Sequence, residues 1–171
     1  VYPGEYAPIA FHRDATYWIA GGLGGFGMQV AKWLASRGAG SLVLSSRREV
    51  SSDEVKRITK EFAGTETRIS ILPTDITNAE MVAETRSKIE ASLPPLAGVF
   101  HAAMVLEDRM LVDLDRATLE RVLWPKMLGG WNLHQQTLGL ALDHFVLFSS
   151  LSSVFGHAGQ ANYSAANALL D

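Results

Sequence analysis

Short apolar runs of strand length alternate with helix-like patterns five times along the chain. The apolar runs lie at residues 16–20, 41–44, 68–72, 98–100 and 144–148. Helices are predicted at residues 25–37, 51–62, 77–93, 115–136 and 160–171. Capping boxes from Ser51 to Glu54 and from Thr77 to Glu80 mark the starts of the second and third helices. Pro125 is expected to kink or split the fourth helix.

Strands that alternate with helices are typical of an α/β protein with a parallel sheet and right-handed crossovers. Uniformly apolar strands belong inside a sheet that is covered on both faces, so the sequence predicts a doubly wound, Rossmann-like sheet. Phe26, Val30 and Leu34 lie on one face of the first predicted helix, and this face is expected to pack on the sheet. The pattern stops in the helix after the fifth strand. Because such sheets often have six strands, we expect a fragment of a longer chain or an excised domain.

Composition narrows the class of protein. The chain has 171 residues, enough for one domain, with 47% hydrophobic and 19% charged residues. A net charge of −3 without any block of like charges gives no support for a nucleic-acid or membrane-surface partner. Cysteine is absent, no apolar run is long enough to span a membrane, and no cluster has metal-ligand spacing. We therefore expect a soluble cytoplasmic domain without a metal.

A glycine-rich segment follows the first predicted strand and opens the first predicted helix. It reads Ala-Gly-Gly-Leu-Gly-Gly-Phe-Gly and fits both G-x-G-x-x-G and G-x-x-x-G-x-G. Glycines permit a tight turn and a close approach to a pyrophosphate, whose charge the helix N-terminus attracts. A plain connecting turn is the alternative, but the strand–turn–helix context favours dinucleotide binding. The predicted contacts are Gly21, Gly22, Leu23, Gly24, Gly25, Phe26 and Gly27.

The end of the second strand indicates which dinucleotide is bound. An NAD site would have Asp or Glu there, whereas this chain has Ser46, Arg47 and Arg48. A guanidinium suits the 2′-phosphate of NADPH, and a solvated arginine pair is the alternative. Asp75, just after the third strand, could accept a hydrogen bond from the adenine amino group. It could equally be a turn residue before the cap at Thr77.

Four polar residues form a candidate catalytic set. Ser150 ends the fifth strand, Tyr163 follows thirteen residues later, and Asn167 lies one helical turn beyond it. A phenol can give a proton to a carbonyl oxygen that a serine hydroxyl holds. Since a free phenol has a pKa of ~10, a nearby cation is needed, and Lys126 is the candidate. Alone, Tyr163 also fits a packing residue of an amphipathic helix, Lys126 a surface charge and Ser150 a cap at the end of a strand. Only the combination indicates catalysis.

Together these motifs, with His-Ala-Ala after the fourth strand, resemble the ketoreductase domain of modular or iterative polyketide synthases. That family belongs to the short-chain dehydrogenase/reductase superfamily, and the ketoreductase of animal-type fatty acid synthase is a close cousin. The resemblance covers residues 16–171. Ordinary members of the superfamily carry Tyr-x-x-x-Lys. Here Asn167 follows Tyr163 and the lysine is Lys126, which is the exchanged arrangement of synthase ketoreductases.

The resemblance implies a role for each residue of the set. Tyr163 would protonate the forming alkoxide, and Ser150 would hydrogen-bond the β-keto oxygen. Lys126 would assist the phenol and link to a proton-relay water, while Asn167 would position the lysine or that water. The substrate would be a β-ketoacyl thioester on the phosphopantetheine of an acyl carrier protein, within a synthase that carries further domains.

NADPH would supply the hydride from C4 of its nicotinamide. Four further residues would complete its cleft, namely Ile76, His101, Ala102 and Ala103. A role for the histidine in lining this cleft is favoured over catalysis or metal binding.

Some features depart from the family pattern or leave alternatives open. Residues 1–14 resemble a connector and residues 15–171 the catalytic domain, without the lid and further strands that the family has beyond that point. Leu106-Glu107-Asp108 only partly matches the Leu-Asp-Asp of one stereochemical type, so it leaves the handedness of the alcohol open with a slight preference for that outcome. A fatty-acid-type synthase remains an alternative. A non-catalytic, cofactor-holding domain would predict a lost catalytic residue, and a free-standing dehydrogenase would predict Lys in place of Asn167.

Overall fold

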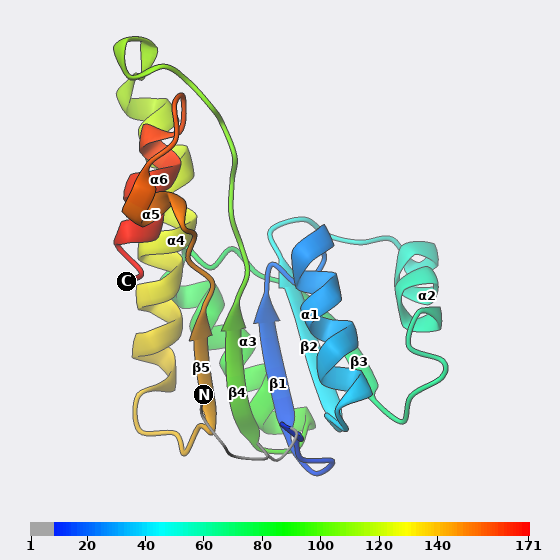
Figure 1. Cartoon of the computed structure of the whole chain (residues 1–171). Coiled ribbons are helices and arrows are strands. Elements are labelled where there is room, and N and C mark those ends of the chain that lie inside the picture. The colour runs from blue at the N-terminus through cyan, green and yellow to red at the C-terminus, as the bar shows by residue number, and fades with distance from the viewer. Residues whose placement is uncertain (1–8) are drawn as a thin grey trace, which may run out of the picture.

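The protein is a parallel α/β sheet flanked by helices, as the sequence predicted. A computed structural model describes residues 9–171, so the first eight residues of the predicted connector lie outside the described part. Its five parallel strands are arranged in the order β3-β2-β1-β4-β5 (Figure 1). The strands are β1 (Thr16–Ala20), β2 (Ser41–Ser46), β3 (Arg68–Pro73), β4 (Leu96–His101) and β5 (His144–Leu147).

Helices cover both faces of this sheet. They are α1 (Gly25–Ser36), α2 (Ser52–Lys60), α3 (Ala79–Ser92), α4 (Arg116–Thr137), α5 (Ser152–Phe155) and α6 (Ala161–Ala168), with a 3₁₀ turn η1 (Leu111–Asp113). Consecutive residues of a strand point to opposite faces. Tyr17 and Ile19 accordingly pack in one core cluster with α1, while Trp18 packs in the other with α3 and Leu133 of α4. The doubly wound class is therefore confirmed.

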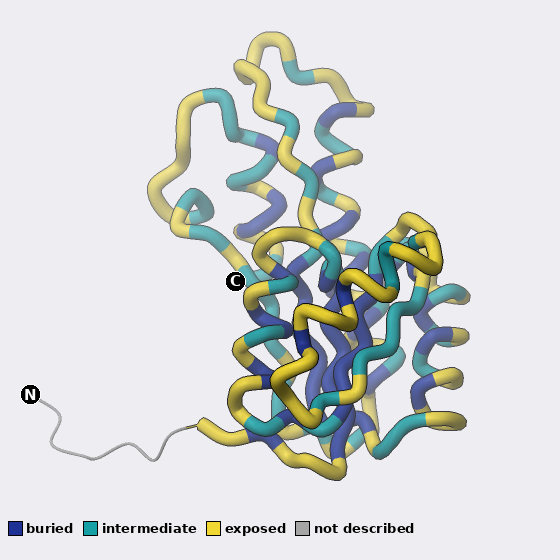
Figure 2. The backbone as a smooth tube through the Cα atoms, turned by 90° about the vertical axis from the view of Figure 1, so that its right-hand side faces the viewer, coloured by how far each residue is buried: buried dark blue, intermediate teal, exposed yellow. Residues whose placement is uncertain are grey.

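The strands are completely buried only at the centre of the sheet. β1 and β4 are buried along their whole length, but β3 and β5, the edge strands, are partly exposed (Figure 2). The expectation that all five strands are covered on both faces is thus wrong for the edges. Phe11, from the predicted connector, belongs to the core, with its ring edge-on to Tyr17 at 5.1 Å between centroids.

Helix ends follow local capping chemistry with one correction. Ser51 Oγ accepts from the Glu54 amide at 3.2 Å, which confirms the first capping box. The second box is wrong, because Asn78 rather than Thr77 caps α3 and accepts from the amides of Glu80 and Met81. The short α5 and η1 were not predicted.

The split at Pro125 and one expected helix face need correction. α4 runs without a break through the buried Pro125, so the helix is not split there. Val30 and Leu34 are buried as expected, but Phe26 is 54% exposed and contacts Phe148 edge-on at 4.8 Å between centroids. Phe26 lies in the first turn of α1, beyond the end of the sheet, so the apolar stripe has no core to meet there.

The chain reverses its direction of winding between β1 and β4. Strands β2 and β3 lie on one side of this point and β4 and β5 on the other, which is where doubly wound sheets bind ligands. α4 extends well past the carboxyl ends of the strands, and α5 and α6 lie beside that extension (Figure 1). Among residues 9–171, no helix is long and apolar enough to cross a membrane.

Candidate active site

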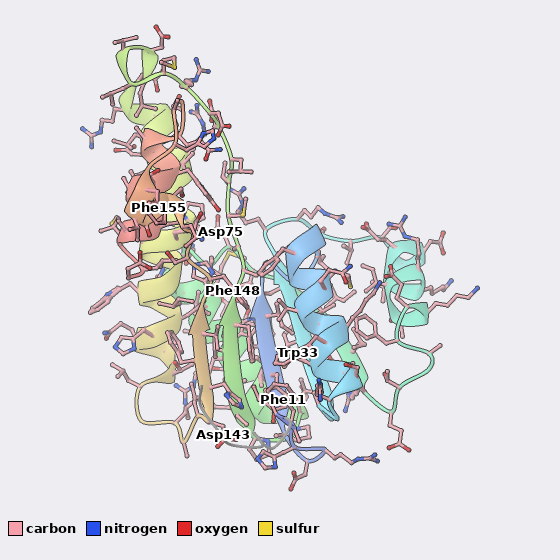
Figure 3. All side chains as sticks on the ribbon, viewed as in Figure 1. Phe11, Trp33, Asp75, Asp143, Phe148 and Phe155 are labelled. Atoms are coloured by element: carbon pink, nitrogen blue, oxygen red, sulfur yellow. The ribbon has the colours of Figure 1, made fainter. Side chains whose placement is uncertain are left out.

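A cavity of about 360 Å³ opens at the winding reversal, at the carboxyl ends of β1 and β4. Its lining brings together most of the residues predicted to bind the cofactor. These are Gly21, Gly24, Gly25, Phe26, Gly27, Ser46, Arg47, Asp75, Ile76, Ala102 and Ala103. Figure 3 shows Asp75 and Phe148 at this carboxyl edge of the sheet.

The glycine loop is shaped for a ligand that approaches the backbone. Gly21 has φ +81°, and a Cβ there would lie 2.6 Å from the backbone of Ala103. A Cβ on Gly27 would collide with the carbonyl oxygen of Gly21. Gly24 and Gly25 face the cavity, and no side chain in the described part of the chain caps α1. The free N–H groups at this helix end suit a phosphate, so the loop fits a dinucleotide.

Three predicted cofactor residues lie outside the cavity lining. Gly22 is packed beneath the turn, where a Cβ would lie 2.9 Å from the carbonyl oxygen of Ile19. Leu23 lines a shallow neighbouring depression with Arg47. The His101 side chain is fully buried, so the expectation that it lines the cleft needs correction.

The two arginines after β2 differ in their partners. Arg48 makes a bidentate pair with Glu54, at 2.8 and 2.5 Å, whereas Arg47 has no ion-pair partner within residues 9–171. Arg47 lines the cavity and is exposed. Asp75 accepts from the Thr77 amide and hydroxyl at 2.9 and 2.7 Å, so it forms the expected turn and still lines the cavity.

Five lining residues were not predicted from the sequence. They are Thr74, Thr77, Met104, Val105 and Pro125. The first two follow β3, and their position next to a strand's carboxyl end was an available signal. The other three come from the segment after β4 and from α4, and only the tertiary fold brings these next to the glycine loop.

Lys126 is a buried cation. Its side chain is 3% exposed, Nζ donates to the Phe148 carbonyl oxygen at 2.7 Å, and Nζ lies 6.0 Å from the centroid of the Tyr163 ring. Burial lowers the pKa of Lys126 to about 8. The structure therefore brings the lysine of α4 next to the tyrosine of α6, as the exchanged arrangement requires.

Of the remaining candidates, Asn167 contacts Tyr163, whereas Ser150 makes its hydrogen bonds within the loop after β5. Ser150 Oγ accepts from the Ser152 amide at 3.2 Å, and Tyr163 Oη lies 4.0 Å from Met104 Sδ. Asn167 is fully buried, and its Nδ2 donates to the Tyr163 carbonyl oxygen at 2.7 Å. Its Oδ1 has no hydrogen-bond partner in the described part of the chain. A buried acceptor of this kind is suited to a lysine or a water.

His101 lies beneath the site, against α4. Neither ring nitrogen has a hydrogen-bond partner among residues 9–171. Burial, and next the charge of Lys126, lower the pKa of His101 to about 4. The backbone at Lys126 and Pro125 raises the pKa of the ring, but by less than burial lowers it. Neither backbone group has the geometry of a hydrogen bond to the ring. The ring is therefore neutral at pH 7.

This histidine is expected to make the fold sensitive to mild acid. Between pH 6.5 and about 4 the unfolded chain binds a proton that the folded chain does not, so the free energy of unfolding decreases as the pH is lowered. The loss is roughly 3 kcal/mol. Urea unfolding at pH 7 and pH 4.5 measures it, with His101→Asn as the comparison. An equal pH dependence in both proteins would contradict the assignment to His101.

No group of three or more His, Cys, Asp or Glu side chains is placed to hold a metal ion within residues 9–171.

Comparison with known proteins gives consistent matches. A family model described as KR domain matches residues 15–171. A phenolphthiocerol/phthiocerol polyketide synthase of Mycobacterium tuberculosis is 39% identical over 159 residues, which are 93% of this chain and 7% of that protein. Among solved structures, an N-terminal ketoreductase from the macrolactin assembly line superimposes with a TM-score of 0.90 at 28% identity, covering 95% of this chain and 33% of that one.

A second solved structure, of A-type ketoreductases from a modular polyketide synthase, is more similar in sequence. It has a TM-score of 0.82 and 38% identity, and the match covers 91% of this chain and 33% of that chain. The present chain thus spans about a third of these ketoreductase chains and a small part of the synthase.

Proposed function

The chain belongs to the KR domain family of polyketide synthases, and on that premise we propose that it reduces a β-ketoacyl thioester to the β-hydroxyacyl thioester with NADPH. One observation carries the proposal: Lys126 Nζ lies 6.0 Å from the Tyr163 ring, beside a cavity that the glycine loop lines. The test is NADPH oxidation, followed by its near-ultraviolet absorbance, with a β-ketoacyl N-acetylcysteamine thioester as substrate.

NADPH fits the residues at the winding reversal. The open backbone at Gly24 and Gly25 and the uncapped end of α1 would hold the pyrophosphate. Arg47 would bind the 2′-phosphate, because its guanidinium has no carboxylate partner among residues 9–171. When bound, the cofactor supplies the hydride.

The side chains of α4, α6 and the loop after β5 would handle the proton and the oxygen. Ser150 Oγ would donate to the ketone oxygen, which gains negative charge as it is reduced. Tyr163 Oη would then give that oxygen its proton. Lys126, held by the Phe148 carbonyl oxygen, would favour release of the phenolic proton through its charge. Asn167 Oδ1 would accept a hydrogen bond from the lysine or from a water that returns a proton to the phenol.

The acyl chain would arrive on an acyl carrier protein, and other domains of a synthase would supply and consume it. The family supports this partner, because the curated relative is a polyketide synthase of which this chain spans 7%. An equivalent place in a fatty-acid-type synthase is the alternative, since the chemistry of the site is the same in both.

Replacement of Arg47 by Ala is expected to weaken NADPH binding about tenfold to a hundredfold, because one charge-assisted contact to the 2′-phosphate is lost. NADH lacks that phosphate, so its dissociation constant should change little. Titration of both cofactors by intrinsic fluorescence measures the ratio.

Arg48→Ala is the matched control, because Arg48 lies next in sequence and is already paired with Glu54. It should leave the ratio of the two dissociation constants close to that of the unmodified protein. An equal loss of NADPH and NADH in Arg47→Ala would contradict the 2′-phosphate assignment. A selective loss in Arg48→Ala would transfer that role to the neighbour.

A further inference from the structure

Residues 104–110 form an extended strap that rises from the end of β4 to η1 and lies along the start of α6 (Figure 1). The Arg109 amide donates to the Gly159 carbonyl oxygen at 2.7 Å, and Gln160 Nε2 donates to Asp108 at 3.0 Å. Further down, Met104 Sδ lies 4.0 Å from the hydroxyl of Tyr163. The strap therefore begins at Met104 and Val105, which line the cavity, and ends beside the start of α6.

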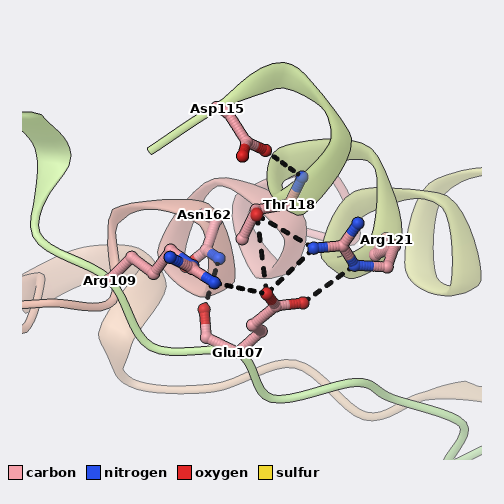
Figure 4. Close-up of polar contacts among 6 residues, drawn as sticks. All are labelled: Glu107, Arg109, Asp115, Thr118, Arg121 and Asn162. Atoms are coloured by element: carbon pink, nitrogen blue, oxygen red, sulfur yellow. Dashed lines mark hydrogen bonds and ion pairs between the residues drawn. The ribbon is translucent and has the colours of Figure 1, made fainter. Parts of the chain in front are cut away.

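Glu107 fastens the strap to α4. Its carboxylate accepts from Nε and Nη2 of Arg121, both at 2.9 Å, and from Arg109 at 3.3 Å (Figure 4). Thr118 Oγ1 lies 3.5 Å away, at the N-terminus of the helix that Asp115 caps. The Arg121 guanidinium, ahead of Arg109, holds the pKa of Glu107 below its ordinary value. The carboxylate is thus charged and held in one orientation.

Asn162 joins the strap to the residue that follows it. Its side chain is 1% exposed, and Nδ2 donates to the backbone carbonyl oxygen of Glu107 at 2.8 Å. Its Oδ1 accepts from the amide of Tyr163, also at 2.8 Å. One buried amide therefore uses both of its ends to link the strap to the backbone of the tyrosine.

The tyrosine needs such support because of its place in α6. Tyr163 lies in the first turn of the helix, where amides lack intrahelical acceptors and the helix end frays. Gln160, at the N-cap position, makes no side-chain cap. The body of α6 packs on α4, so this first turn is the part that needs a separate anchor to keep the phenol near Lys126.

We propose that Glu107, Arg121 and Asn162 are positioning residues that hold Tyr163 in register with Lys126, by tying the first turn of α6 to α4 through the strap. The proposal rests on the proposed reductase function. Glu107 and Arg121 are partly exposed, at 27% and 53% of their side chains, and such ion pairs contribute little to stability. Their effect should therefore appear in the rate rather than in the melting temperature.

Glu107→Gln tests the positioning role. It removes the charge of the carboxylate and leaves in place the backbone carbonyl oxygen to which Asn162 donates. In the intact protein, kcat for the β-ketoacyl thioester is expected to fall about tenfold to a hundredfold, because the proton donor is misplaced. The KM for NADPH should stay unchanged, since Glu107 itself does not line the cofactor cavity. Glu120→Gln is the matched control: Glu120 accepts from Arg116 at 2.6 Å on the same helix, its side chain is 28% exposed, and its ion pair does not involve the strap.

The outcomes separate the positioning role from a structural one. Loss of kcat in Glu107→Gln alone, at an unchanged melting temperature, supports the proposal. An unchanged kcat overturns it, and so does a parallel fall of kcat, NADPH affinity and melting temperature.

Hydrogen exchange decides the case in which the unmodified protein does not reduce the thioester and the proposed function itself fails. Exchange in the peptide that covers residues 159–165 should be faster in Glu107→Gln than in Glu120→Gln. Equal exchange in the two variants overturns the positioning role whatever the activity.

Discussion

Tyr163→Phe is expected to lower kcat for reduction of a β-ketoacyl thioester by about 100- to 10,000-fold, the usual contribution of a positioned general acid. The change removes only the hydroxyl, which lies 4.0 Å from the Sδ of Met104, a residue that lines the cavity. The backbone contacts of Tyr163 with Asn162 and Asn167 do not involve that hydroxyl, so the helix should stay in place. NADPH affinity should therefore be retained, and NADPH oxidation together with a binding titration measures both quantities.

Tyr17→Phe is the control for the loss of a phenolic hydroxyl. Tyr17 is buried in β1, and its oxygen accepts from the His12 amide at 2.8 Å, away from the cavity. That variant should lose about 1 kcal/mol of stability, the typical contribution of one hydrogen bond, and keep its activity. Turnover near that of the unmodified protein in Tyr163→Phe would remove the tyrosine from the proposed mechanism. Loss of NADPH binding in the same variant would assign it a role in holding the cofactor.

The sheet could be predicted because its signal is local and repeated. Each strand is a short apolar run, and β1 shows why this suffices: Tyr17, Trp18 and Ile19 fill both core clusters alternately. The glycine loop was predictable for the same reason, since Gly21 and Gly27 are required by close approaches within one turn. Such features depend on neighbours in sequence, and the sequence displays them.

The features that escaped prediction depend on contacts between distant segments. The exposure of Phe26 follows from where the sheet ends, and the burial of His101 follows from α4 packing across β4. The choice of Asn78 over Thr77 as the cap of α3 was decided by Asp75, whose carboxylate engages the threonine. The strap lies at the site only because α4 and α6 pack against it. No periodicity in the sequence encodes that packing.

Lys126→Met is expected to lower kcat by about 100-fold or more near pH 7, because the phenol loses the positive charge that favours release of its proton. Methionine has a similar length and keeps the site filled. Burial lowers the pKa of Lys126 to about 8, so the unmodified protein itself loses this charge as the pH rises through that value. The difference in kcat between the two proteins should therefore shrink above pH 8, and a pH profile of both proteins measures it.

The same lysine predicts a pH dependence of stability that does not rely on activity. Between pH 8 and 10.5 the unfolded chain keeps a proton that the folded chain has released, so the free energy of unfolding of the unmodified protein rises with pH in that range. Lys126→Met lacks this rise, and it also leaves the Phe148 carbonyl oxygen without its donor, at a cost of about 1–3 kcal/mol. Urea unfolding at pH 7.5 and pH 10 separates the two effects, since only the first depends on pH. A loss of kcat that is equal at all pH values, with the stability difference also constant, would mean that Lys126 acts by holding the Phe148 carbonyl oxygen rather than by its charge.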